Sequence, residues 1–351
     1  MQSILFFLAL VFAAGCSREA PAGQDHAVPS SSAAQTVTAP SAKVLPSNTM
    51  SPKATSPLHE GEGPVHRELR KARITAMTVQ SWSRPGFFQA TLERTDSSGL
   101  AQVTAALALD QQPIVHRRPL ALERLARALD MRVVPATIVR RLSTGELGDL
   151  FANDNETRTY LTAHAAIQND GTVDALLMAP SRGDASTAWR MMSRREMVLE
   201  EAQEARSWAN AVSSAEPLPN ENKALLRDYV ETLVLDYLSG NVLRRSVQFD
   251  EGASEIVLAD NTGAFPQKSF ASGETKLLDR LKPVIRFPKG LRDALVLLDR
   301  QRAQRIFMPG KFDTWLLSQR TLMLLDERRA TLLTLLESRI ATHGEQIVLS
   351  L

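Results

Sequence analysis

The chain has 351 residues, which is enough for one large domain or two smaller ones. Hydrophobic residues make up 44% of it, an ordinary fraction for a protein that buries a core. The formal net charge of +2 and the aromatic content of 5% do not favour nucleic-acid binding, which uses strong positive charge and stacking side chains. A single cysteine, Cys16, excludes an intramolecular disulfide bond.

Residues 1–15 form a short apolar segment that ends in Ala13-Ala14-Gly15 before Cys16. The segment is typical of a signal peptide and is too short to span a bilayer as a mature helix. Its ending resembles the cleavage box of bacterial lipoproteins, in which the cysteine becomes the lipidated N-terminus. The resemblance predicts an exported protein held on a bacterial membrane through Cys16, and Ser17 after the cysteine favours the outer membrane or the periplasmic face. The alternative is an ordinary signal peptide with an incidental cysteine.

Residues 16–65 are rich in Ser, Ala, Pro and Thr and contain few bulky apolar side chains. Such a segment buries too little surface to offset the entropy of ordering it. We therefore expect a disordered tether between the lipidated cysteine and a domain that begins near Val65 or Glu68.

The first part of the domain has mainly strand character. Leu100–Leu109 is compatible with either a strand or a helix. Asn169-Asp170-Gly171 is a turn sequence and predicts a hairpin between the two segments beside it. The predicted elements are strands at Ala72–Trp82 and Gly86–Arg94, a helix at Leu120–Leu129, and strands at Val133–Leu142, Tyr160–Ile167 and Val173–Ala179.

The second part is predicted to be helical. Apolar residues recur at helical spacing between Asn220 and Ser239, and a leucine stripe runs from Leu322 to Ile340. The predicted helices cover residues 193–212, 220–239, 273–283, 288–300, 311–323 and 324–342.

The stretch Leu235–Phe265 contains the most informative motif. Its residues at the end of a helix and after the following strand are Asp236, Tyr237, Gly240, Asn241, Asp260, Asn261, Gly263, Ala264 and Phe265. This pattern resembles the atypical secretory-pathway kinases, the Golgi casein kinase family, and more distantly HipA-like kinases and lipid kinases. The resemblance implies an α+β, two-lobed protein-kinase-like fold with a β-rich N-terminal lobe over residues 66–185 and a helical C-terminal lobe over residues 186–351.

The same resemblance assigns roles to three polar residues. Asp260 stands where the family has its metal-binding aspartate, and Asn241 stands where a second metal or phosphate contact would be. Asp236 corresponds to a position that holds the loop together. A vestigial metal or nucleotide site is therefore predicted at Asn241 and Asp260.

The catalytic residues of the family are missing. Its Asp-Arg-His motif reads Leu243-Arg244-Arg245 here, and leucine cannot act as a general base. The two arginines could bind a phosphate or pair with Asp236 or Asp260. No catalytic residue is therefore predicted.

The partner lysine and glutamate of an active kinase are also absent from their expected places. The lysine position falls in the strand Gly86–Arg94, where Glu93 and Arg94 stand instead. The glutamate position aligns with Pro119 or Leu120, and Glu123 could replace it only if the helix started elsewhere. No histidine, cysteine or glycine-rich motif indicates another chemistry.

Three hypotheses follow. The first is a degenerate kinase-like domain, a pseudokinase, that acts as a binding or scaffolding module on the membrane with an unknown protein partner and no cofactor. The second is a divergent phosphotransferase or nucleotidyltransferase that uses Mg or Mn with a nucleotide at Asn241 and Asp260. The third is a lipoprotein without kinase ancestry, in which residues 221–240 are an amphipathic helix and Asp260–Gly263 is a turn.

Overall fold

The computed structural model of the protein describes residues 62–80, 86–93, 100–109, 114–179, 194–250, 254–267, 271–309 and 315–351. The predicted signal peptide, Cys16, most of the predicted tether and Arg94 lie outside these residues. No helix in the described ranges combines the length and the apolar character that crossing a membrane requires.

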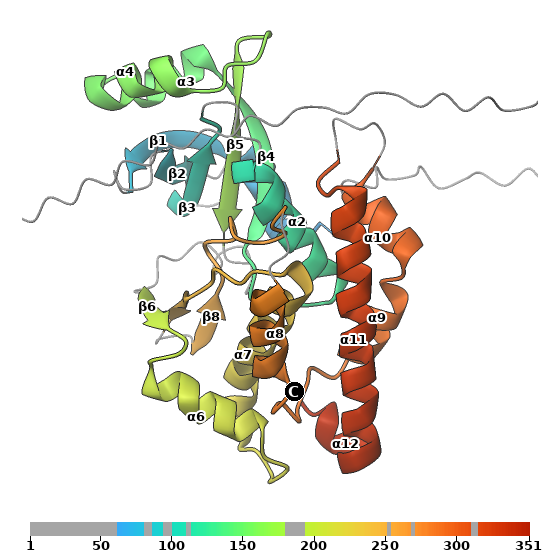
Figure 1. Ribbon diagram of the computed structural model, residues 1–351. Helices are drawn as coiled ribbons and strands as arrows, with labels where there is room; N and C mark the ends of the chain where they lie inside the picture. The colour runs from blue at the N-terminus through green and yellow to red at the C-terminus, as the bar shows by residue number, and fades with distance from the viewer. Residues whose placement is uncertain are drawn as a thin grey trace, which may run out of the picture. The chain divides into compact units, whose positions relative to one another are not determined.

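The first part of the domain is built on an antiparallel five-stranded sheet (Figure 1). The spatial order of the strands is β1-β2-β3-β5-β4, so β3 pairs with β5 rather than with its successor in the chain. The strands are β1 (Arg73–Val79), β2 (Phe87–Glu93), β3 (Leu100–Leu107), β4 (Ala136–Ser143) and β5 (Thr172–Ala179). Leu100–Leu109 is thus mainly a strand, which decides between the two structures that its sequence allowed.

Alternating side chains give the sheet two different faces. One face carries apolar residues such as Leu92 and Leu177 and is covered by α1 (Pro64–Lys71), α3 (Thr144–Leu150) and α4 (Asn155–His164). The other face carries a small cluster of Ala106, Leu176 and Met178. This second face borders the cavity described below.

The second part is mainly helical and contains a small sheet. Its strands β6 (Arg194–Val198), β7 (Ser246–Asp250) and β8 (Glu255–Val257) pair antiparallel in that order. The helices are α6 (Gln203–Val212), η2 (Asn220–Asn222), α7 (Lys223–Ser239), α8 (Ala271–Leu281), α9 (Leu291–Leu297), α10 (Arg300–Phe307), α11 (Gln319–His343) and α12 (Glu345–Val348).

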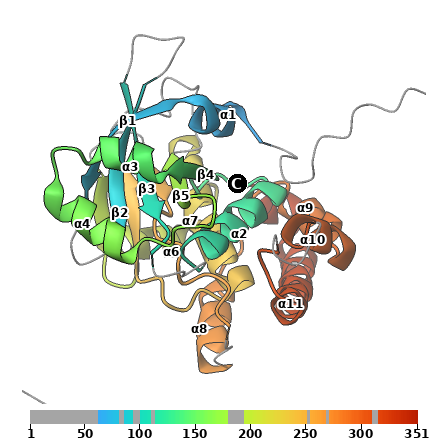
Figure 2. The ribbon, with the colours of Figure 1, turned by 90° about the horizontal axis from the view of Figure 1, so that it is seen from above.

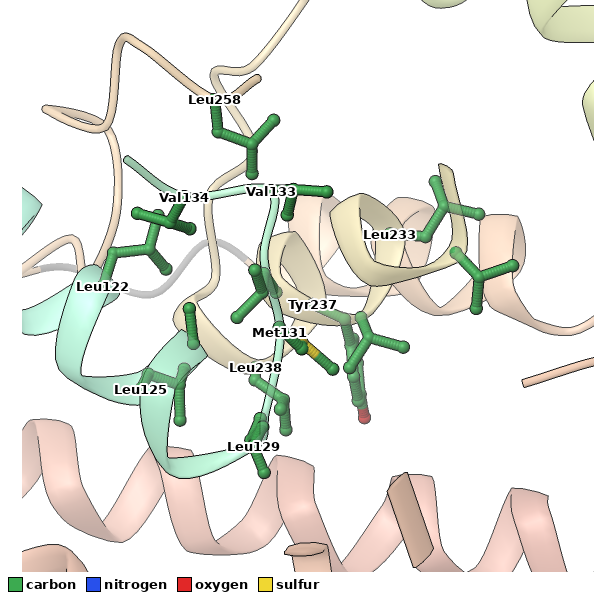
Figure 3. Close-up of a cluster of buried hydrophobic side chains, with 14 of the residues drawn as sticks. Leu122, Leu125, Leu129, Met131, Val133, Val134, Leu233, Tyr237, Leu238 and Leu258 are labelled. Carbon is green, nitrogen blue, oxygen red and sulfur yellow. The ribbon is translucent and has the colours of Figure 1, made fainter. Parts of the chain in front are cut away.

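Helix α2 (Ile114–Ala128) links the two parts. Figure 2 shows it between the large sheet and the group formed by α9, α10 and α11. Its residues Leu122, Leu125 and Leu129 belong to the same buried cluster as Leu238 of α7 (Figure 3). The core of the helical part therefore includes α2, which lies about a hundred residues before α7 in the chain.

Helix α7 is buried on almost every side, including several polar residues. Asp228 Oδ2 accepts a hydrogen bond from Ile256 N at 3.2 Å, and Glu231 Oε2 accepts one from Arg132 N at 2.8 Å. Such partners are required because an unpaired buried carboxylate is strongly unfavourable. The predicted apolar face of this helix is correct, but its opposite face is buried as well.

The predicted strand at Tyr160–Ile167 is wrong, because most of that segment is helix α4. Asp154 caps this helix by accepting a hydrogen bond from Thr157 N at 2.9 Å. The turn at Asn169-Asp170-Gly171 is present, with a hydrogen bond from Gly171 N to Gln168 O, but it leads from an irregular segment into β5. The predicted hairpin partner of β5 is therefore replaced by β4, which pairs with β5 at the edge of the sheet.

The single helix predicted over residues 193–212 is also wrong. Its first part is strand β6, which pairs with β7 so that Arg195 lies opposite Phe249 and Met197 opposite Val247. Only Gln203–Val212 is helical. The sequence has good helix propensity throughout, so tertiary pairing with β7 overrides it.

The predicted boundaries near the C-terminus need correction. The helices expected at 311–323 and 324–342 form one helix, α11, which begins after the N-cap Ser318. The helix expected at 288–300 ends at Leu297, and a separate helix, α10, follows after the N-cap Asp299. The leucine stripe of α11 does face the core, with Leu322, Leu325, Leu332 and Leu336 buried.

Candidate ligand-binding cleft

The cleft begins where helix α7 ends. Gly240 has a φ of +65°, a left-handed conformation that glycine adopts without strain, and a Cβ here would lie 2.7 Å from Arg328 Nη2. The next residue, Asn241, donates from its backbone N to Asp236 O at 2.8 Å. This helix cap fixes Asn241 directly beyond the last turn of α7.

Arg244 ties the loop after α7 to the loop that carries Asp260. Its Nε donates to Asp236 Oδ1 at 2.7 Å. Its Nη1 donates to Asp260 O at 2.8 Å, and its Nη2 donates to Asn261 Oδ1 at 2.8 Å. Of the alternatives open for Arg244, the structure selects pairing with Asp236.

Asp236 is enclosed and serves this loop network. Burial raises the pKa of its carboxyl group, and the neighbouring Arg244 acts in the opposite direction. Its exposed fraction is 1%, so it has no direct route to a bound ligand. These contacts agree with the loop-holding role implied for Asp236.

The loop around Asp260 is held at several points. Asp260 Oδ1 accepts hydrogen bonds from Thr262 N at 3.1 Å and from Thr262 Oγ1 at 2.7 Å. Arg118 of α2 donates from Nη1 to Thr262 O at 3.0 Å. Gly263 is required by close packing, since a Cβ there would lie 2.4 Å from Asn241 Oδ1.

A cavity of about 740 Å³ lies between the large sheet and this loop region. Asn241 and Asp260, the two predicted site residues, both line it, so the structure brings them to one cavity. The remaining lining residues are Gln80, Phe87, Thr104 and Met178 from the large-sheet region and Glu196, Leu243, Arg244, Arg245, Ser246, Val247, Gln248, Ala259, Thr262 and Gly263 from the other side.

Asn241 has unused hydrogen-bonding capacity at this cavity. Its side chain is 1% exposed, and neither Oδ1 nor Nδ2 has a hydrogen-bond partner. Buried amide groups are nearly always paired, because burial without a partner costs about 1–3 kcal/mol. A bound polar ligand would supply the missing partner.

The position of the family's catalytic base holds no acidic group. Leu243 is 72% exposed and lines the cavity. Glu196 of β6 also lines the cavity, where it accepts a hydrogen bond from Ser246 Oγ. Arg245 is exposed there, whereas Arg244 is occupied by the loop contacts.

The predicted place of the phosphate-pairing lysine lies on β2. In protein kinases this lysine stands on the strand before the helix that carries the partner glutamate. Here that strand is β3, not β2. Leu100–Leu107 contains no lysine or arginine, and its Thr104 lines the cavity. The strand before α2 therefore carries no basic side chain that could pair with a phosphate.

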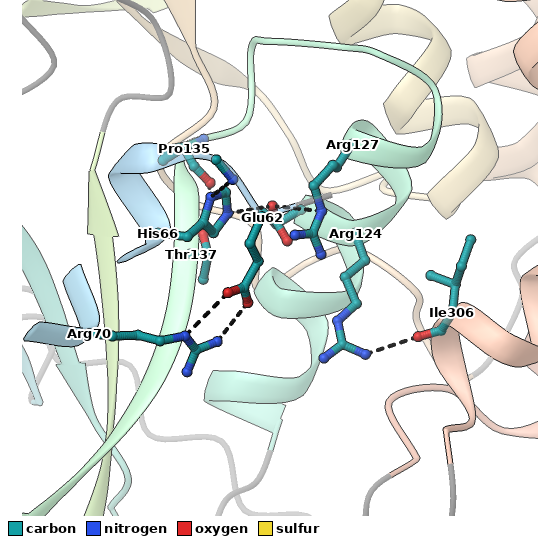
Figure 4. Close-up of polar contacts among 10 residues, drawn as sticks. Glu62, His66, Arg70, Arg124, Arg127, Pro135, Thr137 and Ile306 are labelled. Carbon is teal, nitrogen blue, oxygen red and sulfur yellow. Dashed lines mark hydrogen bonds and ion pairs between the residues drawn. The ribbon is translucent and has the colours of Figure 1, made fainter. Parts of the chain in front are cut away.

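Glu123 does not replace the partner glutamate. Helix α2 starts at Ile114, earlier than predicted, and Glu123 points away from the cavity lining toward α1. Its Oε1 lies 2.8 Å from His66 Nε2 and 3.5 Å from Arg127 Nε (Figure 4). These contacts join α1 to α2.

The residues that sequence reasoning missed come from the large sheet and from β6. Thr104 and Met178 face each other in the register of β3 and β5. The apolar sequence of β3, which precedes a helix, could have indicated that this strand borders the cleft. Glu196 could not be identified, because the sequence around it favours a helix.

The donors for a metal ion are limited. Among the described residues, no group of three His, Cys, Asp or Glu side chains is arranged to hold a metal. Asp260 and Asn241 supply one carboxylate and one amide oxygen at the cavity. Such a pair suits Mg²⁺ only when phosphate oxygens of a ligand complete the coordination.

A five-stranded antiparallel sheet, a linking helix and a helical part around a cleft define a kinase-like fold. Comparison with solved structures confirms the predicted fold class. The chain is similar to the crystal structure of the Golgi casein kinase with Mn/ADP bound, with a TM-score of 0.54 and 13% identity over 81% of this chain and 77% of that chain.

Two further structures show the same likeness. A second crystal structure of the Golgi casein kinase matches with a TM-score of 0.54 and 12% identity, over 82% of this chain and 76% of that chain. The structure of hydra Fam20 with sugar matches with a TM-score of 0.52 and 14% identity, over 83% and 96%. No protein-family model and no curated protein sequence matches the chain.

Proposed function

We propose that this protein is a pseudokinase whose cleft binds a ligand or a partner without phosphoryl transfer. The observation that carries the proposal is the buried, unpartnered amide of Asn241 at a cavity whose base position is Leu243. A phosphotransferase needs a group that orients the attacking hydroxyl and cations that neutralise the phosphates. Leu243 stands at the position of the base, and β3 carries no lysine or arginine, whereas the cleft retains polar binding groups.

The proposal includes attachment to a membrane. Cys16 would carry the lipid, and the segment up to the domain would act as a tether at the bacterial outer membrane or the periplasmic face. Several acyl chains on one cysteine would give firm anchoring, since each buried methylene contributes about 0.8 kcal/mol. A module held in this way meets its protein partner at the membrane and needs no nucleotide.

A nucleotide-binding experiment tests the proposal. The thermal stability of the full-length chain is measured with ATP and Mg²⁺ or Mn²⁺, beside Asp260→Ala. A ligand at a hundredfold excess over its Kd stabilises a protein by about 2.7 kcal/mol, so binding would be visible. We expect no metal-dependent shift in either protein. A metal-dependent shift in the wild type that Asp260→Ala removes would contradict the proposal.

A second experiment tests whether the cleft meets a partner. A photo-crosslinking residue at Leu243, which is 72% exposed at the cavity, is compared in cells with the same residue at Ile167, which is 46% exposed elsewhere. We expect a discrete crosslinked product from position 243 that is lost when Asn241→Ala is added. Equal products from both positions would show that the cleft is not the contact.

One observation favours the alternative of a metal-dependent phosphotransferase or nucleotidyltransferase. Asn241 and Asp260 line the same cavity, and both are oxygen donors of the kind that Mg²⁺ or Mn²⁺ accepts. In this alternative they would hold a metal that neutralises charge on the phosphates of a nucleotide. The metal-dependent shift described above separates the two functions.

A further inference from the structure

Four arginines are buried in the described part of the chain, and one of them differs from the others. Arg244 makes three hydrogen bonds, and so does Arg286, which donates to Ser214 O, Ser350 Oγ and Glu216 O. Arg328 bonds to Leu238 O and forms an ion pair with Glu274. The fourth, Arg124, has a single hydrogen bond.

Arg124 lies on α2, is 8% exposed, and donates from Nη1 to Ile306 O of α10 at 2.9 Å. Among the residues that the structure describes, no carboxylate lies within ion-pair distance of it. Its Nε and Nη2 are not among the fully enclosed nitrogen atoms without a partner, so they keep contact with solvent. Nε and Nη2 of Arg124 are therefore donors to which no described protein group is paired.

The nearest acidic residues are already engaged. Glu62 accepts two hydrogen bonds from Arg70, of which the bond from Nε is 3.3 Å and the bond from Nη2 is 2.6 Å. Glu123 contacts Arg127 and His66. Figure 4 shows Glu62, His66, Arg70 and Arg127 in the same region of the molecule as Arg124.

The local charge is positive. His66 Nδ1 accepts a hydrogen bond from Gly63 N at 3.3 Å, and its Nε2 lies 2.8 Å from Glu123 Oε1. The carboxylates of Glu62 and Glu123 then face the guanidinium groups of Arg70, Arg124 and Arg127, which leaves one excess positive charge. Arg127 Nη1 is, in addition, an enclosed donor without a partner.

A buried cation without a counter-charge is unfavourable by several kcal/mol. The planar guanidinium group matches the oxygens of a phosphate group through parallel hydrogen bonds. We propose that Arg124 and Arg127 form a binding site for a phosphate-type anion where α1, α2 and α10 meet. The site is separate from the cleft and does not depend on the function proposed for it.

The contacts of the anion follow from the free atoms. Arg124 donates from Nε and Nη2, and Arg127 donates from Nη1. Glu123 Oε2 is an enclosed acceptor without a partner, and it would accept a hydrogen bond from the O–H of a singly protonated phosphate or from a bridging water. The site favours phosphate over chloride because the planar guanidinium groups can form parallel hydrogen bonds to phosphate oxygens.

Binding is measured by calorimetry on the purified full-length chain with inorganic phosphate, at constant ionic strength maintained with chloride. Arg124→Gln removes the charge but keeps an amide that can donate to Ile306 O. We expect this variant to bind phosphate about tenfold more weakly or worse, as the loss of a charge-assisted hydrogen bond predicts. Arg141→Gln is the matched control, since it removes an exposed arginine elsewhere, and it should bind as the wild type does.

Arg127→Gln is a second variant in case Arg124→Gln does not fold, and it should also weaken phosphate binding. Vesicles with a phosphomonoester lipid, compared with neutral vesicles, identify the source of the anion. Weaker attachment of Arg124→Gln to the anionic vesicles alone would show a lipid headgroup, and equal attachment would show a soluble phosphate. No phosphate binding by the folded wild type, or equal binding by wild type and both variants, would overturn the proposal.

Discussion

At the scale of single residues, the ion pair between Asp236 and Arg244 is the most consequential contact of the cleft region. Both side chains are almost fully buried, and the arginine reaches Asp260 and Asn261 from the same position. The neighbouring Arg245 is exposed and belongs to the same loop. Two adjacent arginines thus have different environments, which makes each a control for the other.

We expect Arg244→Met to lower the free energy of unfolding by about 3–5 kcal/mol, because it leaves the buried Asp236 without its partner. Arg245→Met should change this free energy by less than about 0.5 kcal/mol, as exposed substitutions usually do. Urea denaturation of both variants measures the difference. Equal effects of the two substitutions would contradict the role assigned to Arg244.

The loss at Arg244 should depend on pH. The pKa of Asp236 is raised by burial, and Arg244 opposes that shift. The folded state therefore favours protonated Asp236, and stability from this group falls as the pH rises from the ordinary aspartate pKa through the folded value. Without Arg244 the folded pKa rises further, so the deficit of Arg244→Met should be smallest in mild acid and grow toward neutral pH. Denaturation curves at several pH values test this, and a deficit that grows in acid would refute it.

Leu243 allows a direct test of whether the missing base alone explains inactivity. Because the residue is 72% exposed, Leu243→Asp should change the free energy of unfolding by no more than about 0.5 kcal/mol. We expect no phosphoryl transfer from ATP in this variant, since β3 carries no lysine or arginine. Metal-dependent ATP turnover by Leu243→Asp, in a radiometric assay, would show that the rest of the site is intact.

At the scale of elements, residues outside the segment decided the secondary structure of two segments that were predicted incorrectly. Residues 193–212 read as one helix, yet Arg194–Val198 pairs with β7. Tyr160–Ile167 read as a strand, yet the cap at Asp154 begins a helix that covers the large sheet. For β6 the deciding partner is β7, which is remote in sequence. For α4 it is the cap residue Asp154, which lies before the segment Tyr160–Ile167.

Helix α4 should depend on its cap. Asp154 accepts hydrogen bonds from Thr157 N and Thr157 Oγ1, and these bonds lower the pKa of its carboxyl group. We expect Asp154→Ala to lower the Tm, whereas Asp154→Asn, which also caps helices, should largely preserve it. The stability that the lowered pKa contributes is present above the ordinary aspartate pKa and lost as the pH falls through the folded value. The wild type should therefore lose any advantage over Asp154→Asn in acid, and a constant difference across pH would refute the assignment.

Much of the cleft was predictable because its residues follow one another in the chain. Asp236, Gly240, Asn241 and Asp260 lie at the end of a helix and after a short strand, and local sequence defines both places. The contributions of Thr104, Met178 and Glu196 were not predictable, because they depend on the strand order β3-β5 and on the pairing of β6. The proposed anion site at Arg124 could not be predicted from the sequence, because it depends on the lack of a carboxylate partner for a buried arginine.

At the scale of the whole molecule, helix α2 is part of the core of the helical region. It shares buried contacts with α7, and Arg124 and Arg118 attach it to α10 and to the Asp260 loop. Beyond its C-terminal end, Arg132 N donates a hydrogen bond to Glu231 of α7.

This packing predicts how the molecule opens. In hydrogen exchange, we expect the amides of α2 to exchange as slowly as those of α7, and more slowly than those of the edge strand β1. Leu122→Ala removes a side chain with 0% exposure and should lower the free energy of unfolding by about 2–5 kcal/mol while it speeds exchange in α2 and α7 together. Leu92→Ala in the large sheet is the control and should affect the sheet first. Exchange of α2 in step with the sheet instead would contradict this arrangement.

The attachment of α2 at both ends and in its middle has a kinetic consequence for the cleft. A cavity whose walls do not rearrange takes up a small ligand in one step, so the observed association rate should rise in proportion to ligand concentration without reaching a plateau. A cavity that must first close around its ligand shows saturation instead, because the conformational step becomes limiting. Because Arg118 of α2 holds Thr262 in the loop that lines the cavity, we expect ligand uptake of the first kind.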